Sequence, residues 1–132
     1  MSWEQVAAQF DFPATGYFNL TPGMTLSELD QSILLSSLRS VYERSGTARY
    51  WLDQLVSEGR TISIRGSNSG SSTLPEFFGI GEGRILIDFS QAQEVALSKH
   101  GSLIPINLGT ILFHEILHTF GFFLTYTKAL KA

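Results

Sequence analysis

The sequence predicts an α+β fold in which two N-terminal helices and a small twisted mixed sheet precede a helix with a histidine motif. Apolar residues recur at helical spacing through residues 25–58 and then alternate with polar residues over 61–65. A second helical segment, almost wholly apolar, follows Asn107. A chain of 132 residues with 43% apolar and 16% charged residues can bury a core of its own. We therefore expect a single domain over residues 1–132.

Composition excludes several classes of function. The chain has no cysteine, so it can form neither a disulfide nor a cysteine-ligated zinc site. Its net charge is −3 and its nine basic residues are scattered, which argues against nucleic-acid binding. The N-terminus lacks the pattern of a secretory signal, and no apolar run is long enough for a membrane span. Cytoplasmic residence and export by a signal-less route both stay open, and the oligomeric state is not determined.

The first segment, residues 1–24, is expected to be irregular. Trp3 and Val6 are spaced to dock a short helix, whereas Pro22 and Gly23 are typical of a loop.

Two helices are expected next. Thr25 and Glu28 fit a capping box at the start of the first helix, and Gly46 fits a left-handed stop at its end. The second helix is predicted over residues 47–58, with Gly59 ending it. The apolar stripe of the first helix comprises Leu26, Leu29, Ile33, Leu34, Leu38, Val41 and Tyr42.

Two strands are expected after these helices. Residues 61–65 alternate polar and apolar side chains, and residues 84–89 form a longer apolar run. Residues 66–83 between them are rich in Gly and Ser and are interpreted as a long connection, in which Phe77 and Phe78 are candidates to contact substrate. Residues 91–106 are interpreted as a mixed connection with room for one helical turn.

The last predicted helix begins after an Asn107 cap, ends near Gly121, and carries the motif H-E-x-x-H as His114, Glu115 and His118. Helical residues four apart lie on the same face, which lets two neutral imidazoles reach one Zn²⁺ ion. Glu115 is rotated about 100° from His114, where its carboxylate can take a proton from a water activated by the metal. The motif therefore predicts His114 and His118 as zinc ligands and Glu115 as the general base of a hydrolase.

A structural interpretation stands beside this one. A core helix can hold two histidines that hydrogen-bond to the backbone, with Glu115 at a solvent gap. Asp88, at the end of the second strand, is either an acceptor for a ligand histidine or simply an acid in a turn or on the surface.

Residues 113–121 resemble the zincin metallopeptidases, and the order helix, helix, strand, loop, strand, motif helix is similar to their N-terminal subdomain. The chain is also similar to small bacterial zinc proteases found among secreted toxins and effectors. The resemblance implies a cleft beside the motif helix and a protein or peptide substrate that pairs with a strand. Residues 84–89 would be that strand or its neighbour.

The third zinc ligand departs from the family pattern. In metzincins a histidine stands where this chain has Leu124. Tyr126, as a phenolate, and His100, folding back, are the weak candidates. Two histidines with waters would also bind zinc, though weakly. The zincin C-terminal subdomain is expected to be short or missing, so the alternative is a degenerate or truncated zincin that acts as a binding module.

Overall fold

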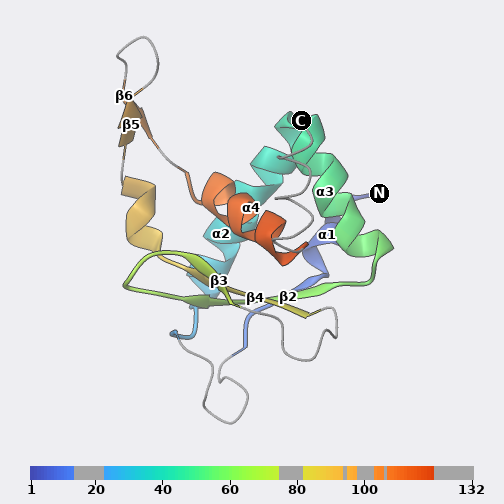
Figure 1. The fold of residues 1–132 in the computed structure, drawn as a ribbon, viewed down its shortest axis with the longest axis horizontal. Coiled ribbons are helices and arrows are strands. Elements are labelled where there is room, and N and C mark those ends of the chain that lie inside the picture. The colour runs from blue at the N-terminus through green and yellow to red at the C-terminus, as the bar shows by residue number, and fades with distance from the viewer. Residues whose placement is uncertain (14–22, 75–81, 94, 98–102, 106, 121–132) are drawn as a thin grey trace.

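Helices cover one face of a small mixed sheet in the computed structural model (Figure 1). The structure describes residues 1–13, 23–74, 82–93, 95–97, 103–105 and 107–120. The helices are α1 (Trp3–Ala7), α2 (Glu28–Arg44), α3 (Gly46–Ser57), a 3-10 helix η2 (Phe89–Gln93) and α4 (Leu108–Thr119). The strands are β1 (Phe10–Asp11), β2 (Thr61–Gly66), β3 (Ser72–Leu74), β4 (Glu82–Ile87), β5 (Val95–Leu97) and β6 (Leu103–Pro105). The α+β class predicted from the sequence is confirmed.

The main sheet has the strand order β1-β2-β4-β3. β1, β2 and β4 run parallel, and β3 pairs antiparallel with β4, so the sheet is mixed, as expected. β3 lies within residues 66–83, for which the sequence predicted a connection without a strand; that prediction was wrong. β5 and β6 form a separate antiparallel pair that projects away from the sheet (Figure 1).

The core lies between the sheet and the helices. On the two central strands, the isoleucines at alternate positions are buried, because successive side chains of a strand point to opposite faces. These are Ile62, Ile64, Ile85 and Ile87. α4 contributes Leu112 and Ile116, both 0% exposed, and contacts β4, β3 and α2. The motif helix is thus held against the end of the sheet that carries β3.

Two serine caps set the helix boundaries. Ser27 caps α2 by accepting from the Asp30 backbone N–H at 3.1 Å, so the cap is not Thr25. Ser45 ends α2 in an extended conformation and also caps α3 through the Ala48 N–H at 3.1 Å. Gly46 is therefore the first residue of α3 and not a left-handed stop. Gly59 follows the C-cap of α3, as predicted, and takes a positive φ of 62°.

The buried stripe of α2 is narrower than the sequence indicated. Leu34, Leu38 and Tyr42 are buried at intervals of four residues. Leu29 and Ile33 are 70% and 42% exposed. An α-helix turns by about 100° per residue, so Leu29 and Ile33 lie roughly 140° and 100° away from Leu34 around the helix axis. Both residues are therefore outside the face of α2 that packs into the core.

The start of the chain contains the short helix for which Trp3 and Val6 are spaced, and the strand β1 follows it, so residues 3–11 are more regular than the irregular segment expected over 1–24. Ser2 and Gln5 form a capping box at α1, and the Trp3 ring packs against Tyr42 at 5.7 Å between ring centroids. The Tyr42 hydroxyl lies 3.1 Å from the Met1 carbonyl and 2.8 Å from Asp53. These contacts tie α1 to α2 and α3.

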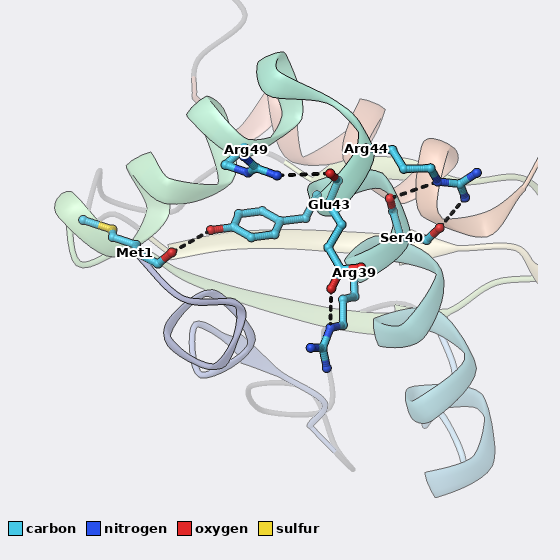
Figure 2. A network of polar contacts seen from close by, with 7 residues as sticks. Met1, Arg39, Ser40, Glu43, Arg44 and Arg49 are labelled. Atoms are coloured by element: carbon cyan, nitrogen blue, oxygen red, sulfur yellow. Dashed lines mark hydrogen bonds and ion pairs between the residues drawn. The ribbon is translucent and has the colours of Figure 1, made fainter.

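A neighbouring set of polar contacts joins α2 and α3 (Figure 2). Arg49 of α3 donates to the Glu43 carbonyl at 3.1 Å, while the Glu43 carboxylate accepts from Arg39 at 2.8 Å. Arg39 and Glu43 are both more than half exposed, so this ion pair adds little stability.

Candidate metal centre

The motif lies on α4 as the sequence predicted. Asn107 caps the helix by accepting from the Thr110 backbone N–H at 2.8 Å, and the helix ends at Thr119. The buried face of α4 includes Leu108, Leu112 and Ile116, so it is this face that anchors the motif to the core.

The end of α4 is held by a neighbouring arginine. Arg60, which follows α3, donates to the Thr119 carbonyl and lies over the Phe120 ring, 4.8 Å from its centroid. Trp51 packs against the same ring at 5.2 Å between centroids. A cation at a helix C-terminus satisfies carbonyls that lack an intrahelical partner. These contacts fix the turn that carries His118.

His114 and His118 come together on one face of α4. Their Nε2 atoms are 3.2 Å apart, and their rings lie at 78° with centroids 4.8 Å apart. His114 is exposed and His118 is half-buried, so both are reached from solvent.

This separation fits two ligands of one zinc ion. Two nitrogens at about 2.0–2.1 Å from a tetrahedral Zn²⁺ are about 3.3–3.4 Å apart, close to the 3.2 Å seen between the Nε2 atoms of His114 and His118. The same distance suits a direct hydrogen bond in which one Nε2–H donates to the other ring. Both arrangements use the same atoms, so metal binding would replace that hydrogen bond without moving the helix.

Glu115 points away from solvent, toward the end strand of the sheet. Its side chain is 8% exposed, and its Oε2 lies 2.8 Å from the Thr73 hydroxyl on β3. The same hydroxyl lies 2.8 Å from the Glu115 backbone carbonyl. Thr73 was missed by the sequence analysis. The sequence feature that could have indicated a strand at Thr73 is a β-branched residue followed by the apolar Leu74 within a stretch rich in Gly and Ser.

Asp88 is a buried acid in a turn and not a partner of the histidines. Its carboxylate accepts from the Gly70 N–H at 2.9 Å, from the Ser90 N–H at 3.0 Å and from the Ser90 hydroxyl at 2.7 Å. The hydrogen bonds from Ser90 and Gly70 lower the pKa of Asp88 below its usual range and outweigh the opposing effect of burial.

The third-ligand candidates His100 and Tyr126 lie outside the described residues, as do Leu124 and the Phe77–Phe78 pair. Within the described ranges, no three His, Cys, Asp or Glu side chains are grouped so that they could hold a metal ion. In the described part of the chain, the candidate site therefore consists of two histidines, one glutamate and Thr73. The cleft expected beside α4 stays a prediction.

Comparison with family models, with curated proteins and with solved structures found no match for this chain. Among the helices in the described part of the chain, none has the length and apolar character that crossing a membrane requires.

Proposed function

We propose that this chain is a zinc-dependent metallopeptidase of zincin type. The observation that carries the proposal is the 3.2 Å separation of the His114 and His118 Nε2 atoms, with Glu115 next in sequence. His114 and His118 would hold the ion through Nε2, which requires both rings to be neutral. Glu115 would be the general base.

The catalytic roles follow from the chemistry of these groups. A zinc ion held by His114 and His118 would supply Lewis acidity, which polarises a scissile carbonyl and makes a water more acidic. The Glu115 carboxylate accepts the proton of that water and afterwards delivers it to the leaving amine. The Glu115 side chain is buried and accepts a hydrogen bond from Thr73, and a carboxylate held in this way needs little reorganisation during a reaction.

The position of β3 supports a peptide as substrate. β3 is the end strand of the described main sheet and touches α4 beside the motif. An end strand offers backbone N–H and C=O groups to an extended peptide, which binds by adding a strand. β4, which contains most of residues 84–89, would then be the neighbour of the substrate-pairing strand.

Elemental analysis and a peptide-hydrolysis screen test the proposal. We expect zinc near one equivalent in protein purified without chelators, and its loss in His118→Ala. Glu115→Gln on the same helix is the matched control: it should keep zinc and lose hydrolysis by about 10²–10⁴-fold, the usual contribution of a general base. Hydrolysis that survives in Glu115→Gln would contradict the mechanism.

The second candidate function is a binding module built on a degenerate zincin site. The observation that favours it is that the described residues contribute only two histidine ligands on α4. Wild-type protein that takes up no zinc even at micromolar concentration, with no hydrolysis of any peptide screened, would support this alternative. The His114–His118 contact would then be a direct hydrogen bond.

A further inference from the structure

The Thr73 hydroxyl has two acceptors and one hydrogen. It lies 2.8 Å from Glu115 Oε2 and 2.8 Å from the Glu115 backbone carbonyl oxygen. A threonine hydroxyl donates one hydrogen and accepts through its lone pairs. It can therefore donate fully to only one of these two oxygens at a time, and both oxygens belong to Glu115.

The backbones on both sides of this contact are held in place. Thr73 is opposite Ile85 in the pairing of β3 with β4, and Ile85 is 1% exposed in the core. Glu115 precedes Ile116, which is 0% exposed, on the helix capped by Asn107. The hydroxyl therefore joins two packed elements, which is the arrangement that fixes a reacting group most closely.

We propose that Thr73 is a positioning residue for Glu115: its hydroxyl, fixed on β3, holds the Glu115 carboxyl in one orientation. This inference rests on the proposed function, because it gives Thr73 the role of orienting the residue proposed as the general base. It adds a residue from β3, 42 positions away in sequence, to the three residues of the motif.

Substitution at Thr73 tests the proposal through the kinetic constants. Thr73→Val replaces the hydroxyl with a methyl group of similar size, and Thr73→Ser retains the hydroxyl. We expect Thr73→Val to lower kcat about tenfold to a hundredfold with KM changed by less than about twofold. Thr73→Ser should restore most of kcat. Ser36→Ala, which removes an exposed hydroxyl from α2, is the control and should leave both constants unchanged.

A second measurement needs no activity. Urea unfolding of metal-free wild type, Thr73→Val, Glu115→Ala and the double variant forms a double-mutant cycle. We expect Thr73→Val to raise the unfolding equilibrium constant about tenfold in the wild-type background and much less beside Glu115→Ala, because a hydrogen bond to a carboxylate is lost in only one of them. Additive effects would show that the hydroxyl does not hold this carboxyl and would overturn the proposal.

The two measurements separate this inference from the function on which it rests. If wild type hydrolyses peptides and Thr73→Val is equally active, the positioning role is wrong and the peptidase stands. If wild type has no zinc and no activity, the proposed function fails and the catalytic role of Thr73 fails with it, even where the cycle shows coupling. Reduced kcat, rescue by serine and coupling in the cycle together would support both.

Discussion

At the scale of single residues, Asp88 shows how one carboxylate organises the loops beside β3. It follows β4 and accepts hydrogen bonds from Ser90 on one side and from the Gly70 N–H on the other. Gly70 has a φ of 93°, which L side chains rarely adopt, so the backbone there can turn toward the carboxylate. Asp88 is 7% exposed, and its bonds link the turn before β3 to the end of β4.

Because of Asp88, part of the free energy of unfolding should depend on pH in the acid range. Since its pKa is lowered in the folded protein, chiefly by the Ser90 hydroxyl, the stabilisation is complete above the pKa of the unfolded chain. It is lost as pH falls through the lower pKa of the folded state. We expect Asp88→Asn to be less stable by about 1–3 kcal/mol at neutral pH and to lose less further stability in acid.

Urea midpoints measured from about pH 6 to about pH 2 check this expectation for Asp88. Asp11→Asn, at an exposed position of β1, is the control and should follow the wild-type acid dependence. Parallel curves for wild type and Asp88→Asn would contradict the role given to this carboxylate.

At the scale of elements, the crossing of α4 over α2 depends on Gly109. A Cβ atom at this position would overlap the backbone of Ser37 and lie 3.0 Å from the Leu38 nitrogen. Backbone atoms cannot move aside as the end of a flexible side chain can, so the two helices approach this closely only because residue 109 has no side chain. The crossing in turn sets how α4, which carries the two histidines, packs against β3 and β4.

Gly109→Ala should therefore destabilise the protein despite the better helix propensity of alanine. We expect a loss of about 1–3 kcal/mol, the usual cost of overpacking a core, in the free energy of unfolding in urea. Gly46→Ala is the matched control, because a Cβ on Gly46 of α3 meets no atom within 4 Å. That variant should be neutral or slightly more stable, by up to about 1 kcal/mol. An equal loss in both would exclude the close crossing as the cause.

The long elements were predictable and the short ones were not. The helices over 28–57, the strand from Thr61 and the motif helix each repeat a period often enough to be recognised. β3 has only three residues, too few to show the alternation of polar and apolar side chains that identifies a strand. This strand is defined by its pairing with β4. The start of α2 was misplaced because Thr25 and Ser27 are both hydroxyl residues that can cap a helix, and packing of Leu26 into the core selects the second.

At the scale of the whole molecule, one part of the candidate site could be predicted from the sequence and another part could not. The helix alone brings His114 and His118 together, so their proximity could be predicted from a spacing of four residues. The hydrogen-bond partner of Glu115 could not be predicted, because Thr73 comes within reach of Glu115 only when β3 has joined the sheet and α4 has packed against that sheet. The zincin resemblance, carried by residues 113–121, contains no information about that contact.

Zinc should stabilise the whole fold if the two histidines bind it. An ion that binds only the native state stabilises by RT ln(1 + [Zn²⁺]/Kd), about 2.7 kcal/mol at a hundredfold excess over Kd. For a chain of 132 residues this corresponds to a rise in Tm of roughly 5–10 °C. Thermal melts with and without zinc measure it. His114→Ala and His118→Ala should lose the rise, a chelator should reverse it, and Glu115→Gln should keep it. A rise of equal size in both histidine variants would mean that zinc binds elsewhere on the chain, and the site on α4 would then be no zinc site.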